Sequence, residues 1–176
     1  MQSEAKEKPQ YAVVAAVQLP GVSDAEFEAS LTELRELAKT LGFKVTRSFT
    51  QKRSGFDSTA YLGGGKREDI RRFVNSRPVD ETESDHAPQN PLYRLSTLVE
   101  GGDVNGVAVS PDPIDVIFVD HEISPSQARN LENEVGCQVM DRTMVILEIF
   151  HRNARSPAAR AQVEIARLGY MAPRLR

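Results

Sequence analysis

Three glycines followed by a lysine, at 63–66, could hold a phosphate group. Backbone amides that open a helix, with a lysine beside them, are a common phosphate site. The P-loop pattern is incomplete, because Ala60 stands at its leading glycine and Arg67 replaces the magnesium-contacting serine or threonine. Glu68 likewise replaces the third glycine of the dinucleotide fingerprint. We favour a structural turn, with weak ATP or GTP binding as the alternative. This candidate phosphate loop consists of Gly63, Gly64, Gly65 and Lys66.

A second candidate for chemistry is His121, which lies between the carboxylates Asp120 and Glu122. It follows an apolar stretch typical of a buried strand, and ligand sites of α/β folds lie at the carboxyl edge of the sheet. A histidine in this setting could act as a general base or bind a metal ion. His86 and His151 lie far away in the sequence, and no serine or cysteine has the setting of a nucleophile elbow. We therefore favour a polar loop before a helix, and we predict no catalytic residue and no metal site.

Arginine is concentrated at the C-terminal end of the chain. Residues 142–176, here called the arm, contain seven arginines, no lysine and two glutamates, a net charge of +5, whereas residues 1–141 carry 15 basic and 23 acidic side chains. The total of −3 excludes a wholly basic nucleic-acid coat. Arginine binds phosphate through paired hydrogen bonds and stacks on bases, which fits RNA contact better than membrane anchoring. From composition alone, a solvated helix face with Arg–Glu pairs explains the arm equally well.

These residues need elements that position them, and the sequence predicts alternating strands and helices. Capping boxes at Ser23 and Ser124 each mark the start of a helix. We expect strands at 11–17, 43–50, 114–119 and 137–140, with helices at 24–41 and 125–135 and a strand and glycine turn at 59–66 before a helix at 67–74. The alternating pattern of 43–50 indicates a strand near an edge. The predicted fold is α/β, with a mostly parallel sheet of about four strands flanked by helices and followed by a C-terminal helical arm.

Three segments depart from the α/β pattern. Residues 1–10 are polar and charged, and we expect a disordered tail. Residues 75–113 hold five of the ten prolines, which predicts an exposed insertion with an ordered piece near 93–99. The arm reads as two helices interrupted at Ser156-Pro157, a partial hairpin that buries little on its own. The predicted divisions are therefore the tail 1–10, an α/β region 11–141 with the insertion 75–113, and the arm 142–176.

Six blocks of sequence occur in an order that is specific to one family. They are VQLPGVS from Val17, Thr50-Gln51, YLGGGK from Tyr61, EISPSQ from Glu122 with NLE from Asn130, DRT from Asp141 with ILEIF from Ile146, and QVE from Gln162. Together they resemble the N-terminal region of the HflX family of translational GTPases. The resemblance runs from about residue 11 to residue 176, with 75–113 as an extra insertion.

The resemblance implies a parallel α/β subdomain and a helical arm, followed by a GTPase domain. It also implies binding to the large ribosomal subunit, rescue or splitting of stalled ribosomes under stress, and an arm that enters toward the peptidyl transferase centre. ATP and RNA binding by this region are implied for some members. The family's arm loop resembles Arg-x-Arg-Thr-Arg-Glu-Gly-Lys, of which Arg155 and a basic residue at Arg160 are kept here. Pro157 replaces one arginine of that loop, and two alanines replace its acid–glycine pair.

Three functions remain open. The leading hypothesis is a non-catalytic module that binds the large ribosomal subunit or rRNA through Arg152, Arg155, Arg160 and Arg167. The alternative is an interaction or regulatory adaptor that binds a partner, or forms a homodimer, through the apolar face of the arm. The third is a weak ATP- or GTP-binding domain.

The rest of the sequence narrows the setting. No Walker motif occurs in residues 1–176, so we expect no GTP hydrolysis by this polypeptide. The chain is either a piece of a longer protein or a stand-alone relative of the family, and we favour the second. The single cysteine, Cys137, excludes a disulfide framework and a cysteine-based zinc site. No signal peptide or membrane-length apolar run is present, which favours a cytoplasmic protein without membrane contact.

Overall fold

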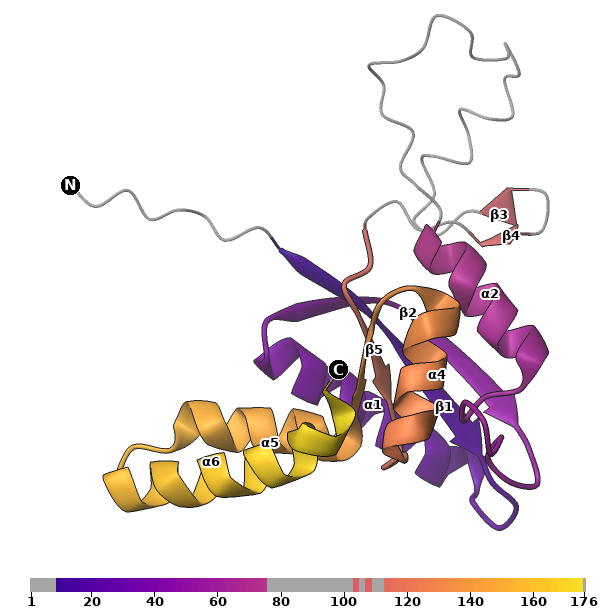
Figure 1. The fold of residues 1–176 in the computed structure, drawn as a ribbon. Coiled ribbons are helices and arrows are strands. Elements are labelled where there is room, and N and C mark those ends of the chain that lie inside the picture. The colour runs from indigo at the N-terminus through magenta and orange to yellow at the C-terminus, as the bar shows by residue number, and fades with distance from the viewer. Residues whose placement is uncertain (1–8, 76–102, 105–106, 109–112, 176) are drawn as a thin grey trace, which may run out of the picture.

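The computed structural model describes residues 9–75, 103–104, 107–108 and 113–175 (Figure 1). Four parallel strands form its main sheet, in the spatial order β2-β1-β5-β6. They are β1 (Gln10–Gln18), β2 (Phe43–Lys52), β5 (Val116–Val119) and β6 (Gln138–Asp141), and a separate antiparallel pair joins β3 (Asp103–Val104) to β4 (Val107–Ala108). This confirms the predicted α/β sheet, with β2 at an edge. The predictions for residues 1–8 and for 76–102 lie outside the described residues.

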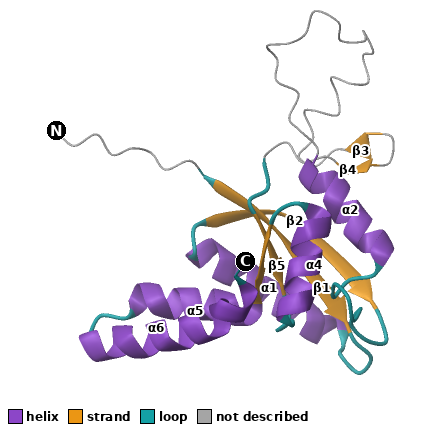
Figure 2. Ribbon diagram, in the orientation of Figure 1, coloured by secondary structure: helices purple, strands orange, loops and turns teal. Residues whose placement is uncertain are grey.

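Helices cover both faces of the sheet (Figure 2). They are α1 (Asp24–Thr40), α2 (Gly64–Asn75), α4 (Pro125–Val135), α5 (Arg142–Asn153) and α6 (Pro157–Met171), with a short 3-10 helix η2 (Ala172–Arg174). α1 and α5 pack on one face, and α2 and α4 pack on the other. Because β1 leads into α1 and β5 leads into α4, the chain leaves these neighbouring strands on opposite faces.

Local signals in the sequence begin and end two of these helices. Ser23 accepts the amide hydrogen of Glu26 at 3.1 Å, and Glu26 accepts that of Ser23 at 3.2 Å. Ser124 and Gln127 form the same reciprocal pair at the start of α4. Gly136 ends α4 with φ of 82°, a conformation that costs glycine little. The predicted capping boxes are confirmed, and α4 ends at Val135 as predicted.

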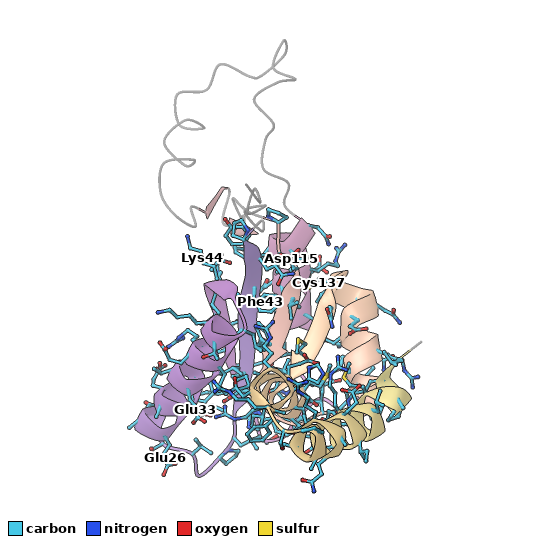
Figure 3. All side chains as sticks on the ribbon, turned by 90° about the vertical axis from the view of Figure 1, so that its left-hand side faces the viewer. Glu26, Glu33, Phe43, Lys44, Asp115 and Cys137 are labelled. Atoms are coloured by element: carbon cyan, nitrogen blue, oxygen red, sulfur yellow. The ribbon has the colours of Figure 1, made fainter. Side chains whose placement is uncertain are left out.

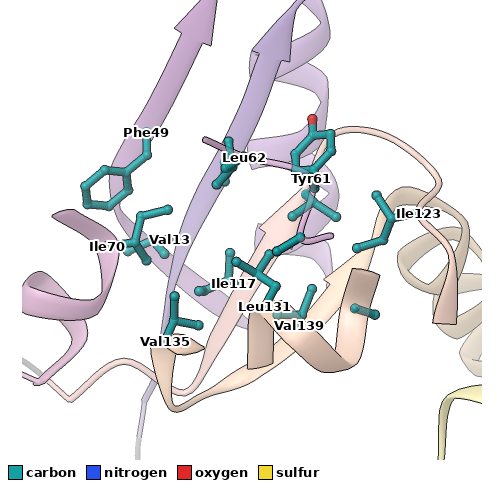
Figure 4. Packing of buried hydrophobic residues seen from close by; sticks show 14 of the residues in the cluster. Val13, Phe49, Tyr61, Leu62, Ile70, Ile117, Ile123, Leu131, Val135 and Val139 are labelled. Atoms are coloured by element: carbon teal, nitrogen blue, oxygen red, sulfur yellow. The ribbon is translucent and has the colours of Figure 1, made fainter. Parts of the chain in front are cut away.

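The central strand β1 supplies side chains to both hydrophobic layers. Its odd-numbered residues from Val13 to Val17 pack with α2 and α4, and its even-numbered residues from Ala12 to Ala16 pack with α1 and α5. Figure 4 shows the first layer, where Leu131 of α4 lies close to Ile117 and Val139 of the strands. Burial on both faces explains why β1 reads as an unbroken apolar run.

The predicted strand before the glycine turn is wrong. In place of a strand in the sheet, residues 59–62 form a compact turn with a single bridge between Asp57 and Tyr61, and α2 already begins at Gly64. Ala60, Tyr61 and Leu62 are nevertheless fully buried. The apolar residues at 59–62 are therefore those of a loop buried against the sheet. The periodicity of a sequence cannot distinguish such a loop from a short buried strand.

The arm is a helical hairpin that projects from the α/β unit (Figure 1). α5 and α6 run side by side in opposite directions, and η2 brings the chain back to α4. Among the described residues, no helix has the length and apolar character needed to cross a membrane.

Replacement of Leu131 by alanine should destabilise the protein strongly. Leu131 is fully buried between α4 and the sheet, and removal of such a side chain leaves a cavity that costs about 2–5 kcal/mol. Leu168→Ala on α6 is the control, because Leu168 is 52% exposed and its loss should change stability by less than about 0.5 kcal/mol. Urea denaturation followed by circular dichroism measures both, and equal losses would contradict this packing.

Candidate functional site

The tip of the arm, residues 152–160, carries three arginines that no carboxylate neutralises. Arg152 and Arg155 are exposed, and neither side chain forms a hydrogen bond or ion pair with another described residue. Arg160 is exposed as well, and its Nε donates to the carbonyl oxygen of Ala154 at 3.1 Å, which closes the turn between the helices. The tip therefore presents three guanidinium groups to solvent at the end of a rigid hairpin.

The other described arginines of the arm are paired with carboxylates. Each has a guanidinium nitrogen within 4 Å of a carboxylate oxygen, and Arg176 lies outside the described residues. The pairs are Arg142 with Asp120 and with Glu33 at 2.9 Å, Arg167 with Glu148 at 2.5 Å and Glu164 at 3.5 Å, and Arg174 with Asp141 at 3.8 Å. This pairing concentrates the unneutralised positive charge of the arm in its tip.

The four arginines predicted to contact RNA therefore differ in their surroundings. Arg152, Arg155 and Arg160 lie together at the tip, whereas Arg167 lies in the middle of α6 and joins that helix to Glu148 of α5. The hydrogen bond with Glu148 also raises the pKa of Arg167, which favours the charged form of its guanidinium group. Contact of all four with RNA stays a prediction.

The outer face of α6 carries an exposed apolar stripe. Ala161, Ile165, Leu168 and Ala172 are exposed and recur at spacings of four, three and four residues. Ile165 is 73% exposed, and Phe150 of α5 is a further exposed apolar side chain on the hairpin. Alternation of four and three residues is the spacing of a seam between packed helices.

The candidate phosphate loop is engaged by its own surroundings. The amide of Gly63 donates to Gln51 Oε1 at 2.9 Å, and Arg67 is paired with Glu134 at 2.7 Å. A Cβ atom at Gly63 would lie 2.5 Å from Arg53 Nη1, so the Arg53 side chain would have to move to accommodate any larger residue. These contacts account for Gly63 as a packing residue, while ATP or GTP binding by Gly63, Gly64, Gly65 and Lys66 stays a prediction.

A hollow of about 370 Å³ lies beside this loop, at the ends of β1 and β2. Gln18 donates to Asp24 at 2.9 Å and Lys52 lies 3.8 Å from the same carboxylate, which together hold the pKa of Asp24 below its usual value. Glu28 adds a second carboxylate to the lining. Because two acids face one lysine here, the hollow lacks the excess positive charge that favours phosphate.

At the carboxyl edge of the sheet, Asp120 and His121 contact different elements. Asp120 is almost fully buried and accepts hydrogen bonds from Arg142 and from Ser30, the latter at 2.8 Å. His121 Nδ1 lies 2.6 Å from the hydroxyl of Tyr61. The interpretation of this triplet as a polar loop before a helix agrees with these contacts, although Asp120 is a buried ion-pair partner rather than a solvated side chain.

Tyr61 is held in an unusual backbone conformation, with φ of 74°. Its hydroxyl oxygen accepts the amide hydrogen of Val17 at 3.1 Å, in the part of β1 that extends past its pairing with β5. The hydroxyl can donate its own hydrogen to His121. Burial raises the pKa of Tyr61 and lowers that of His121, so both groups are held neutral. The sequence alone did not indicate this pair, because 60 positions separate the two residues.

Polar residues of the Glu122 and Asn130 sequence blocks also have structural partners. Gln127 donates to the carbonyl oxygen of Asp57 at 2.9 Å, and Asn130 donates to that of Thr59 at 2.9 Å. Both contacts fasten the buried turn before α2 to α4. Gln127 and Asn130 therefore have structural roles in this fold.

Solved structures with a similar fold include a GTP-binding protein. That protein, from the hyperthermophilic archaeon Sulfolobus solfataricus and in complex with GDP, has a TM-score of 0.53 and 20% identity, covering 94% of this chain and 38% of that chain. A structure of SsGBP with GDP has a TM-score of 0.56 and 22% identity, covering 94% and 36%. At this identity the likeness concerns the fold alone. It defines the class as an α/β unit with a helical hairpin that occurs within larger GTP-binding proteins.

The sequence pattern of the family described as "GTP-binding GTPase N-terminal" matches residues 28–86 and 93–151. GTPase HflX of Gluconacetobacter diazotrophicus is 44% identical over 170 residues, covering 94% of this chain and 37% of that protein. GTPase HflX of Escherichia coli K12 is 46% identical over 116 residues, covering 61% and 26%. The chain therefore belongs to the N-terminal domain family of the HflX GTPases, which confirms the resemblance. It spans between 26% and 37% of the length of these two relatives.

Acidification should destabilise the folded protein partly through His121. Burial lowers the pKa of His121 in the folded state, whereas an unfolded histidine titrates near pH 6.5. As pH falls below about 6.5, the unfolded state binds a proton first, so folding loses free energy. Denaturant titrations between pH 7.5 and 5.5 should show a smaller loss in His121→Gln, whose amide can still accept from Tyr61. An identical pH dependence in both proteins would contradict the assignment.

Proposed function

We propose that this chain is a non-catalytic RNA-binding module that contacts the large ribosomal subunit, or its rRNA, through the tip of the arm. The observation that carries the proposal is the separation of charge within the arm. Arg142, Arg167 and Arg174 are neutralised inside the fold, while Arg152, Arg155 and Arg160 are exposed together. Guanidinium groups that lack protein partners are suited to bind phosphate oxygens in pairs.

The shape of the arm suits contact at a distance from the α/β unit. α6 has 15 residues and is therefore about 22 Å long. The α/β region carries most of the 25 acidic side chains of the chain, which repel a polyanion. A basic tip on a helical hairpin can reach into RNA while the acidic region stays outside, as a narrow site on a ribosome would require.

The resemblance to the HflX family, which implies contact with the large ribosomal subunit, supports the same proposal. The two relatives are called GTPase HflX and are longer than this chain, which matches their N-terminal portion. We infer that the chain keeps the ribosome-contacting part of this family, acts in the cytoplasm during stress, and carries out no GTP hydrolysis by itself.

Removal of two tip arginines should weaken RNA binding. Arg155→Ala combined with Arg160→Ala should raise the Kd for isolated large subunits at least about tenfold, because two phosphate contacts are lost. The slope of log K against log salt concentration should become less steep by about two. Filter binding or sedimentation across a salt series measures both quantities.

The matched control removes two lysines from the α/β unit. Lys39 and Lys44 are exposed on α1 and β2, far from the tip in the chain. Lys39→Ala with Lys44→Ala changes net charge equally and should leave the Kd and the slope nearly unchanged. If both double variants lose affinity to the same extent, binding follows net charge and the tip has no special role.

The apolar stripe on α6 favours a second candidate, self-association through the arm. An antiparallel pair of α6 helices from two copies would bury Ile165 and Leu168 against each other and would bring each basic tip toward the acidic α/β region of its partner. The stripe and this charge complementarity fit a second copy of the chain.

Charges placed in the stripe should abolish such a dimer. In sedimentation velocity at rising concentration, the wild type should shift toward twice the monomer mass, whereas Ile165→Glu with Leu168→Glu should stay monomeric. Glu36→Ala on the exposed surface of α1 serves as the control and should dimerise like the wild type. A wild-type protein that remains monomeric at several hundred micromolar would refute self-association.

A further inference from the structure

Two buried carboxylates at the ends of adjacent strands join the arm to the α/β unit. Asp120 directly follows β5, and its side chain is 2% exposed. It accepts hydrogen bonds from Ser30 of α1 and from Arg142, the first residue of α5. Arg142 also forms an ion pair with Glu33 of α1, at 2.9 Å. Glu33 is labelled on that helix in Figure 3. The start of the arm is therefore tied to both β5 and α1.

Asp141, the last residue of β6, binds the C-terminal end of the arm, which lies at the base of the hairpin. Its side chain is 1% exposed, and it accepts the amide hydrogens of Met144 at 2.9 Å and of Ile123 at 3.3 Å. The hydroxyl of Tyr170, near the end of α6, donates to the same carboxylate. One buried group thus joins the first turn of α5, the last turn of α6 and the β5–α4 loop.

Arg174 completes this junction from η2. Its guanidinium carbon lies 3.7 Å from the centre of the Tyr170 ring, and Nη2 donates to the carbonyl oxygen of Ile123 at 2.5 Å. Nη1 donates to the carbonyl oxygen of Tyr170 at 3.0 Å. Although Arg174 belongs to the arginine-rich arm by sequence, its side chain is only 9% exposed and is unsuited to contact RNA.

Few side chains of the arm are fully buried. α6 has no buried residue, and α5 buries Met144 and Val145 beside α1, while Ile149, Tyr170 and Met171 pack against the same cluster and are partly buried. The polar junction at the base adds directional contacts to this packing. Buried charges of this kind are costly when unpaired and tolerate few alternative geometries.

We propose that Asp120 with Arg142, and Asp141 with Tyr170 and Arg174, form an anchor that fixes the direction of the arm and thereby pre-orients the tip for RNA. This inference rests on the proposed function. Tyr170 and Arg174 are positioning residues, because they touch no RNA and act through the direction of the hairpin. If loosening reduces the competent fraction to about one tenth, the apparent Kd rises about tenfold.

The test measures direction and affinity separately on the full chain. Spin labels at Ala158→Cys in the tip and Glu36→Cys on α1, in a Cys137→Ala background, report the distance between arm and α/β unit by pulsed electron resonance. The wild-type anchor should give one narrow distance distribution. Tyr170→Phe with Arg174→Gln should broaden that distribution and raise the Kd for large subunits about tenfold, while circular dichroism remains unchanged.

A milder variant and a control complete the design. Tyr170→Phe alone removes one hydroxyl and should give intermediate broadening even where the double variant unfolds. Gln162→Ala, on the exposed surface of α6, should match the wild type in both measurements. A narrow distribution in the folded anchor variants would overturn the anchor, and a broad distribution with wild-type Kd would overturn pre-orientation. Failure of the wild type to bind RNA would instead refute the proposed function, since the distances are measured without RNA.

Discussion

Two carboxylates buried at the carboxyl ends of neighbouring parallel strands, Asp120 and Asp141, impose the constraint on which the arrangement of this molecule depends. A buried carboxylate is tolerated only with hydrogen-bond donors or cations close by. Several of those donors come from the arm, through Arg142, Tyr170 and Arg174. The hairpin therefore supplies groups that the sheet edge requires, and the two parts hold each other in place.

This constraint divides the arginines of the arm into two sets with different tasks. Those at the base and middle of the hairpin neutralise carboxylates and hold helices together, as Arg142 and Arg167 do. Those at the tip face solvent. The net charge of +5 over residues 142–176 is thus a poor guide to a binding surface until the internal pairs are removed from it. The unpaired positive charge that remains is confined to the tip of the arm.

Local signals made most of the fold predictable, and long-range contacts account for what sequence reasoning missed. Ser23, Ser124 and Gly136 act within a few residues, so their patterns predicted helix ends correctly. The turn at 59–62 resembled a strand because its burial comes from a distant sheet. Arg174 looked like another exposed cation, since its contact with Ile123 spans 51 positions. Pro173 is consistent with the end of α6 at Met171 but gives no sign of the contacts that Arg174 makes.

The carboxyl edge of the sheet is where open α/β folds usually bind ligands, at the point where neighbouring strands send the chain to opposite faces. Here that point lies between β1 and β5, and the protein's own side chains occupy it. Arg142 and Ser30 approach Asp120 from one face, and Tyr61 joins Val17 to His121 on the other. Because the usual ligand position is used to hold the arm and the buried turn, the proposed contact with RNA is placed away from the sheet edge, at the tip of the arm.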